Sequence, residues 1–273
     1  MDAPIRIGTQ GWNYAAWVGP FYPTGTRAPD YLTTYARAFR TVEVDSTFYA
    51  VPPPRTVRGW AQRTPDDFVF ALKMPQEVTH ERRLRDADDV VDAFLASARE
   101  LGGKLGPILL QMGPDFGPDE FGALERFLPR LPDDVRVAVE VRQQRWMKPD
   151  VRPDLLSLLA THGRALALSD GRWIDRETMT ALAERPTADF HYVRWMGPNR
   201  DITDYSHLQF DRADEIDAWA RVLRMQPGRG VSVYGYFNNH FAGHSPENAR
   251  QLLRELGQPV VDPASLDEQT SLF

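Results

Sequence analysis

Seven charged side chains stand where short apolar runs of the sequence end, and they are of two chemical kinds. The carboxylates are Glu43, Asp45, Glu140 and Asp170, and the cations are Lys73, Arg142 and Arg194. Carboxylates serve as general acids and bases or as oxygen ligands of a divalent metal ion. Lysine and arginine bind anions, phosphate above all. The mixture predicts a site for a phosphate-bearing substrate, with a divalent metal ion as a candidate cofactor.

Imidazole, amide and hydroxyl side chains occupy comparable positions. We expect His80 to transfer protons together with the four carboxylates. The groups expected to bind phosphate together with the three cations are Asn238, Asn239, His240, His244 and Ser245. His244 and Ser245 begin a helix, and a helix N-terminus attracts phosphate. His240 and His244 are four residues apart but straddle Gly243 at a turn, so they do not form the helical zinc-binding pattern H-E-x-x-H.

Each of these charges also has an ordinary structural interpretation. Glu140 with Arg142, or Asp170 with Arg194, would make satisfied ion pairs, and such pairs occur in structural networks as well as in active sites. The whole set is more informative than its members, because buried charge is costly and its concentration in one place needs a reason.

Eight short apolar runs, bounded by turn residues, predict eight strands. Runs such as FVFAL and VRVAVEV are almost continuously apolar, which is typical of parallel strands buried on both faces. The predicted strands are Ile5–Gly8, Thr41–Asp45, Phe68–Lys73, Leu105–Gln111, Val135–Val141, Ala165–Ser169, Phe190–Met196 and Val231–Phe237.

Segments with helical periodicity lie between most of these runs. They are residues 28–39, 89–103, 119–128, 153–162, 175–185, 212–223 and 245–257, the last with Ser245 as N-cap. The alternation predicts a single (β/α)8 TIM barrel over residues 1–257, followed by a tail over residues 258–273. The competing open, doubly wound sheet lacks its G-x-G-x-x-G signature after the first strand.

Two long loops follow the first and seventh predicted strands, at Gly11–Pro29 and Gly197–Gln209. Both leave the carboxyl ends of strands, where barrel active sites form, so the charged residues above are expected to meet there. Aromatic residues are abundant around the same face. Most are expected to pack the loops onto the barrel, and a minority to stack on a base or a sugar ring.

Composition narrows the class of protein. The 273 residues are 42% hydrophobic and 26% charged, which are ordinary globular values. A net charge of −6 argues against a surface coated in basic residues for nucleic acid, but allows a local basic cleft. The absence of cysteine excludes thiol catalysis and cysteine-ligated metal sites. With neither a signal-peptide pattern nor an apolar run of ~20 residues, a cytoplasmic protein without a membrane span is expected.

Six stretches in order along the chain resemble the YecE-like family, catalogued as a domain of unknown function. They are IGTQGWNYAAWVGPFYP, VEVDSTFYAVP, FALKMPQEVTH, VEVRQQRW, FHYVRWMG and YFNNHFAGHSPENA. The resemblance implies a TIM barrel and no settled activity. This chain has Asp45 where the family pattern usually has Asn, and Met196 where it often has His, which argues against a metal site at the seventh strand.

The last five residues, QTSLF, resemble the peptide by which bacterial DNA polymerases and repair proteins bind the sliding clamp. Its defining residues here are Gln269, Ser271, Leu272 and Phe273, and residues 258–268 would serve as a spacer. The alternative is that Leu272 and Phe273 pack back onto the barrel.

Three hypotheses for function follow. The favoured one is a hydrolase, of the phosphoesterase or nuclease type, that acts on a phosphate-bearing substrate in DNA repair or replication-associated processing. Nucleic acid is its favoured substrate. A second is a carbohydrate hydrolase that uses Glu43 and Glu140 as its carboxylate pair. A third is a non-catalytic adaptor that binds nucleic acid or protein at the barrel and the clamp through its tail.

Overall fold

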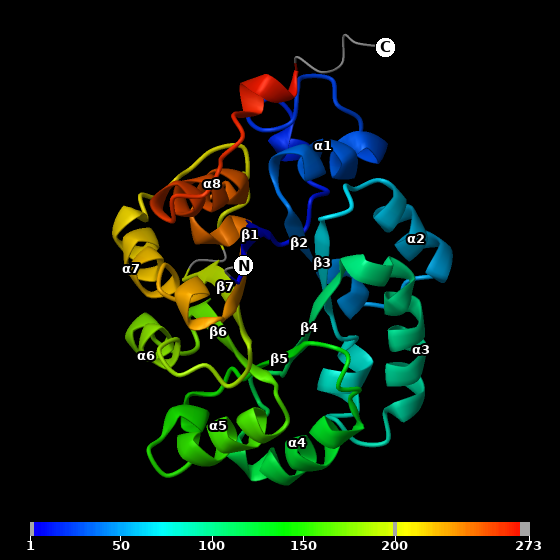
Figure 1. The fold of residues 1–273 in the computed structure, drawn as a ribbon, viewed down its shortest axis with the longest axis vertical. Coiled ribbons are helices and arrows are strands. Elements are labelled where there is room, and N and C mark those ends of the chain that lie inside the picture. The colour runs from blue at the N-terminus through cyan, green and yellow to red at the C-terminus, as the bar shows by residue number, and fades with distance from the viewer. Residues whose placement is uncertain (1–2, 199–200, 268–273) are drawn as a thin grey trace.

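The protein is a barrel of eight parallel strands surrounded by helices, as the sequence predicts (Figure 1). The computed structural model describes residues 3–198 and 201–267. The strands run in the order β1-β8-β7-β6-β5-β4-β3-β2. They are β1 (Ile5–Thr9), β2 (Thr41–Val44), β3 (Val69–Lys73), β4 (Leu105–Gln111), β5 (Val137–Glu140), β6 (Ala165–Gly171), β7 (Phe190–Gly197) and β8 (Ser232–Phe237).

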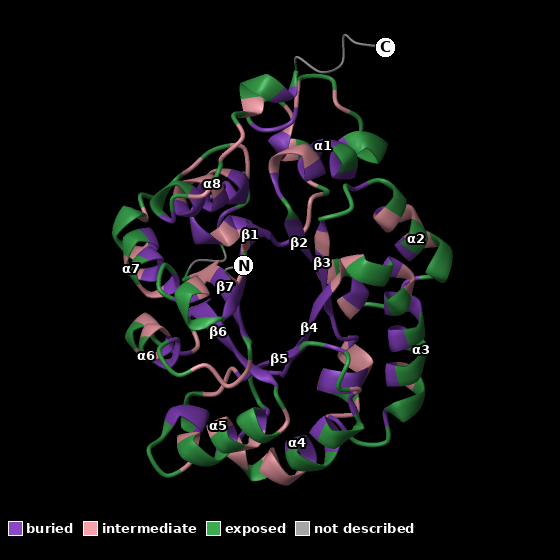
Figure 2. Cartoon of the chain, viewed as in Figure 1, coloured by how far each residue is buried: buried purple, intermediate pink, exposed green. Residues whose placement is uncertain are grey.

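The α-helices of the described residues form the outer layer and turn their buried faces toward the strands (Figure 2). They are α1 (Tyr31–Ala38), α2 (Pro54–Gln62), α3 (Asp88–Ala98), α4 (Phe121–Phe127), α5 (Arg152–Thr161), α6 (Arg176–Leu182), α7 (Ala213–Leu223) and α8 (Ser245–Glu255). Among the described residues, every helix is too short or too polar to cross a lipid bilayer.

The interior of the barrel holds its own packed layer, separate from the core between strands and helices. Alanines on β3, β5 and β6 and Leu109 on β4 face large aromatic side chains on β7 and β8. The layer comprises Ala71, Leu109, Ala138, Ala165, Ala167, Phe190, Tyr192, Tyr234 and Tyr236. Side chains alternate along a strand, so a residue two positions after a member of this layer also points inward. These later residues lie at the carboxyl ends of the strands.

The barrel closes at the seam between β1 and β2. Gly8 allows the backbone of β1 to approach the carbonyl oxygen of Thr41, since a Cβ at this position would overlap that oxygen. The Tyr35 hydroxyl, from α1, donates to the Thr41 carbonyl at 3.0 Å and accepts from the Thr9 amide at 2.9 Å. Just beyond, the amide of Gly11 donates to the carbonyl of Glu43 at 2.8 Å. The seam thus fixes the position of Glu43.

Two local predictions need correction. Helix α2 was not predicted, because its sequence PRTVRGWAQ follows two prolines and buries only Val57 and Trp60. Helix α8 begins at Ser245 with His244 as its N-cap, so Ser245 is not the capping residue.

The segment after α8 does not behave as a free spacer. Val260 and Val261 pack against the core, and Leu266, in a short 3-10 helix at Pro263–Leu266, is buried. Figure 1 shows this segment beside α1. The clamp-like residues Gln269, Ser271, Leu272 and Phe273 lie outside the described residues.

The seam gives a first prediction. Gly8→Ala forces a methyl group against the Thr41 carbonyl and should lower the free energy of unfolding by about 1–3 kcal/mol, as overpacking does. Gly59→Ala in α2 is the matched control: it meets open space and should stabilise the helix by about 0.5–1 kcal/mol. Urea denaturation of both variants measures the difference, and equal stabilities would contradict the close approach at the seam.

Candidate functional site at the carboxyl ends of the strands

Most of the predicted site residues meet at the mouth of the barrel, above the interior aromatic layer. Lys73 and Glu140 are the last residues of β3 and β5, and Glu43 and Arg194 lie near the ends of β2 and β7. By the alternation of side chains along a strand, all four point inward. The carboxyl ends of parallel strands lie at one edge, so residues distant in sequence become neighbours there.

Arg194 is the centre of this group and is almost completely buried. Its Nε and Nη2 donate to the two oxygens of Glu43 at 2.9 and 2.7 Å, a bidentate pair. Its Nη1 donates to Oε2 of Glu140 at 2.7 Å. The Tyr192 hydroxyl donates to Oε2 of Glu43 at 2.6 Å. One guanidinium group therefore connects β2, β5 and β7 across the barrel.

Arg142 completes the pairing of Glu140. Its Nε donates to Oε1 of Glu140 at 2.6 Å, and its Nη2 donates to Oε1 of Gln111 at 2.6 Å. The same Gln111 oxygen accepts from Arg194 at 3.2 Å. All four carboxylate oxygens of Glu43 and Glu140 are thus occupied by donors from the protein.

The two buried glutamates have pKa values displaced in opposite directions. Burial raises the pKa of Glu43 to about 7, against the attraction of Arg194, and the negative charge of Asp45 adds to the rise. Burial also acts on Glu140, but Arg142 and Arg194 outweigh it and hold its pKa at about 2. The difference follows from the partners, because Glu140 has two guanidinium groups whereas Glu43 shares one and faces another carboxylate.

A cavity of about 450 Å3 opens above this network, and its walls carry both charge and apolar surface. Lys73 Nζ lies 3.8 Å from the centre of the Phe48 ring, and no carboxylate of the described residues lies within 4.0 Å of it. His80 packs edge-on against the same ring at 5.0 Å. Asp45 also lines the cavity, 3.7 Å from Arg194.

Two groups that line this cavity, Lys73 and His80, have lowered pKa values. Burial lowers the pKa of Lys73 to about 8, and the charge of Arg194 adds to the effect. Burial, then the charges of Lys73 and Arg142, lower the pKa of His80. His80 Nδ1 is 2.8 Å from the Thr79 hydroxyl, while Nε2 makes no hydrogen bond within the described residues. A neutral imidazole and a weakly acidic ammonium group therefore share one wall.

Asp170 does not join this group, and its expected place at the mouth is wrong. Its carboxylate accepts from Trp219 Nε1 at 2.7 Å and from Arg176 Nε at 2.6 Å. Both partners belong to the surrounding helices α7 and α6. The inward-facing residue at this end of β6 is Ser169, two positions after Ala167, so Asp170 points away from the barrel interior.

The residues after β8 divide into two groups. Asn238 lines the cavity and donates to Gln10 Oε1 at 2.8 Å. By contrast, Asn239 accepts from the Ser245 hydroxyl at 2.8 Å, His244 Nδ1 donates to the Tyr205 carbonyl at 2.8 Å, and all three side chains are buried. His240 is 3.3 Å from the Tyr205 hydroxyl. The N-terminus of α8 is therefore closed by its own hydrogen bonds and does not line the cavity.

The carboxylates at the mouth do not form the ligand set expected for a divalent metal ion. The oxygens of Glu43 and Glu140 are held by guanidinium groups, and Asp45 lies beside Arg194. Within the described residues, no three histidine or acidic side chains are grouped so that they could hold a metal ion.

Two amides that line the cavity, Gln10 and Gln76, were not predicted from the sequence, nor was Tyr192, which holds Glu43 from below. Gln111, the last residue of a predicted strand, also lines the cavity. Tyr192 could have been found from its alternation with Arg194 along β7. Gln76 follows the end of β3 in a loop, where no periodicity indicates which way a side chain points.

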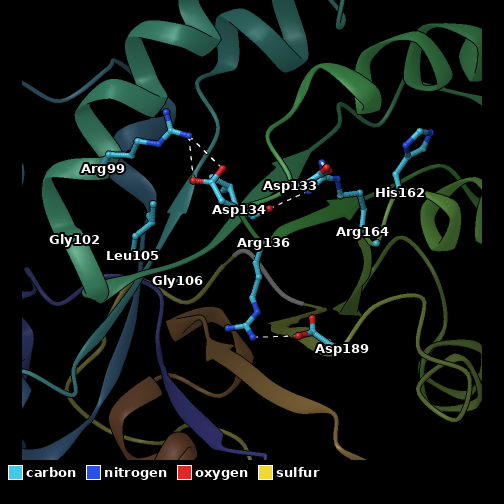
Figure 3. A pocket seen from close by; sticks show the side chains of 12 residues that line it. Arg99, Gly102, Leu105, Gly106, Asp133, Asp134, Arg136, His162, Arg164 and Asp189 are labelled. Atoms are coloured by element: carbon cyan, nitrogen blue, oxygen red, sulfur yellow. Dashed lines mark hydrogen bonds and ion pairs between the residues drawn. The ribbon is translucent and has the colours of Figure 1, made fainter.

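A larger cavity, about 730 Å3, lies at the opposite face of the barrel (Figure 3). Its charged side chains are largely paired with one another: Arg99 with Asp134 at 3.3 Å, and Arg136 with Asp189 at 3.2 Å. Arg164 donates to the carbonyls of Leu131 and Val135. These contacts stabilise the loops below the strands.

The fold and the site together define a single (β/α)8-barrel protein whose polar cavity lies at the carboxyl ends of its strands. Within that class, the chain belongs to the family described as "Protein of unknown function DUF72", which matches residues 6–270.

Relatives match over nearly their whole length. UPF0759 protein YecE of Escherichia coli K12 is 38% identical, covering 98% of this chain and all of the relative. UPF0759 protein YunF of Bacillus subtilis 168 is 26% identical, covering 92% and 94%. A crystal structure of a DUF72 family protein from Thermotoga maritima MSB8 superposes with a TM-score of 0.75 at 24% identity, covering 93% of this chain and all of that one. These comparisons agree with the barrel fold.

The displaced pKa of Glu43 predicts a pH dependence of stability. The pKa of Glu43 rises from 4.5 to about 7 on folding, so Glu43 contributes up to about 3 kcal/mol to the free energy of unfolding below pH 4.5. This contribution is lost as the pH rises through 7. Glu43→Gln should abolish that loss between pH 5 and 7 in urea denaturation.

The control is Glu140→Gln. Glu140 has a lowered pKa, so its stabilisation is present above pH 4.5 and is lost only as pH falls toward 2. This variant should keep the wild-type slope between pH 5 and 7. Parallel profiles for the wild type and Glu43→Gln would contradict the account of the network.

Proposed function

We propose that the mouth cavity is the active site of a hydrolase that cleaves phosphoester bonds, with nucleic acid as its favoured substrate class. The proposal rests on two cations, each with N–H donors that make no hydrogen bond or ion pair within the described residues. Lys73 has no carboxylate partner within the described residues, and Arg142 uses Nε and Nη2 for its partners while Nη1 makes no hydrogen bond there. Both line the cavity, where they would bind a phosphate group.

The reaction needs a base for the attacking water and an acid for the leaving group. His80, with its lowered pKa, is neutral near pH 7 and would accept a proton from water at Nε2 as the oxygen attacks phosphorus. Lys73, with a pKa of about 8, would donate a proton to the ester oxygen as the phosphorus–oxygen bond breaks. Arg142 would stabilise the charge on the remaining phosphate oxygens. The products are an alcohol and a shortened phosphate ester.

The buried network argues against the carbohydrate hydrolase. A glycosidase needs one carboxyl group free to give a proton and another free to act as nucleophile or base. Glu43 and Glu140 have 0% of their surface exposed, and every oxygen is bound by Arg194, Arg142 or Tyr192. Their arrangement suits support of the cations better than contact with a sugar.

Lys73→Met tests the reaction. Losing the acid should lower kcat/KM for single-stranded, nicked or abasic DNA by about 100-fold or more, and no buried carboxylate is left unpaired. Wild-type activity should fall above about pH 8 as Lys73 loses its proton. Arg99→Met, at the opposite face, is the control and should keep full activity.

Two results would overturn the proposal. One is the absence of cleavage of any of the three DNA substrates by the wild-type protein, and the other is unchanged activity of Lys73→Met. Tight binding of DNA without cleavage would support the non-catalytic adaptor instead.

The tail suggests how an acidic protein would reach DNA. The proposal that QTSLF tethers the barrel to the sliding clamp is supported by the sequence motif alone. Since residues 260, 261 and 266 pack on the barrel, the tether would consist only of the residues after Asp267.

Phe273→Ala should weaken binding to the purified clamp by about 10-fold or more and leave the unfolding temperature unchanged, as calorimetry would show. Leu266→Ala is the contrasting variant: it removes a buried side chain and should cost about 2–5 kcal/mol of stability. A drop in unfolding temperature for Phe273→Ala would show that the tail packs on the barrel.

A further inference from the structure

A second hollow of about 390 Å3 lies beside the mouth cavity and has a different character. Its walls include Trp12, Asn13, Tyr14, Asp45, Ser46 and Trp60. Asp45 lines both cavities. The consecutive residues Gln10 and Gly11 line the mouth cavity and the second hollow, respectively. The two spaces therefore adjoin at Asp45.

The aromatic walls of this hollow are held in place. Trp12, which is half-buried, packs edge-on against Trp60 with ring centres 5.9 Å apart. The Tyr14 hydroxyl donates to the Gln10 carbonyl at 3.0 Å, and its ring lies 4.7 Å from that of Trp17. By contrast, Trp17, Phe21 and Tyr22 of the same loop are buried in the core.

Two polar side chains of the hollow are available to a ligand. The amide of Asn13 and the hydroxyl of Ser46 are exposed, and neither makes a hydrogen bond within the described residues. An amide offers both a donor and an acceptor, and Asp45 adds an acceptor. Fixed aromatic rings with a few polar groups at the edge are what a planar heterocycle needs, whereas a sugar needs polar partners around its whole rim.

We propose that this hollow binds the nucleobase of a nucleotide whose phosphate lies against Lys73 and Arg142. The inference rests on the proposed function and narrows it, because it makes the substrate a nucleotide unit with its base unpaired. The two adjoining spaces, about 390 and 450 Å3, are each large enough for one part of such a unit. Sequence preference would then come from Asn13 and Ser46.

Titration calorimetry on the full-length protein with four probes tests the proposal. The probes are thymidine 5′-monophosphate, 2-deoxyribose 5-phosphate, thymidine and inorganic phosphate. The nucleotide should bind about 10-fold or more tightly than the sugar phosphate, since stacking of a base contributes that much. Trp12→Leu should remove this difference and leave the affinity for the sugar phosphate unchanged.

Asn13→Ala is a second variant that should not disturb folding. The Asn13 side chain is exposed and makes no hydrogen bond within the described residues. It should reduce the preference for the nucleotide while the unfolding temperature stays at the wild-type value. Unchanged preference in both variants would overturn the proposal.

The probes separate this inference from the proposed function. Equal affinity for the nucleotide and the sugar phosphate would overturn the nucleobase site and leave the phosphate site standing. Binding of thymidine with no gain from the phosphate would support the nucleobase site and overturn the phosphate site. A further titration uses glucose 6-phosphate. Tighter binding of this sugar phosphate than of the nucleotide would show that a sugar ring fills the hollow, and would overturn the proposal.

Discussion

The bidentate pairing of Arg194 with Glu43, extended to Glu140, is the interaction on which the mouth of the barrel depends. A guanidinium group and two carboxylates without access to water are costly unless every donor and acceptor is satisfied. Here Arg142, Gln111 and Tyr192 supply the remaining hydrogen bonds. Removing Arg194, or a glutamate that it binds, would leave a buried charge without its partner. The network therefore specifies the relative positions of β2, β5 and β7.

This constraint decides which groups are available for chemistry. Glu43 and Glu140 are the most deeply buried acids at the mouth, and hydrogen bonds from Arg142, Arg194 and Tyr192 use all of their oxygens. The groups that remain are Lys73, His80 and Asp45, which line the cavity. Burial lowers the pKa of Lys73 and of His80, and the positive charge of Arg194 or Arg142 adds to the effect. The structural network thereby contributes to the protonation of the groups beside it.

The sequence predicts the barrel well because each strand is a continuous apolar run and each run is separated by a helix-length segment. It also predicts that charged side chains from distant strands meet at the carboxyl ends of the strands. It fails where two polar residues are adjacent in a strand, because they point in opposite directions and the sequence does not show which points inward. Asp170 follows Ser169, and only the pairing of β6 with β7 shows which of the two faces the interior. It also fails for Asn239 and Ser245, since a helix N-terminus that is closed by its own side chains has the same sequence pattern as one open to phosphate.

Membership of the DUF72 family establishes the fold but no reaction, so the reaction is inferred from the site. The two ends of the barrel offer a direct comparison, because both hold arginines beside a cavity. Each arginine of the opposite cavity has a carboxylate within 4.0 Å, whereas Lys73 at the mouth has none among the described residues. A crystal structure of the protein soaked with thymidine 5′-monophosphate measures this difference. The account predicts electron density for the phosphate within hydrogen-bonding distance of Lys73 Nζ and Arg142. Phosphate density beside Arg136 and Arg164 at the opposite face, with an empty mouth, would contradict it.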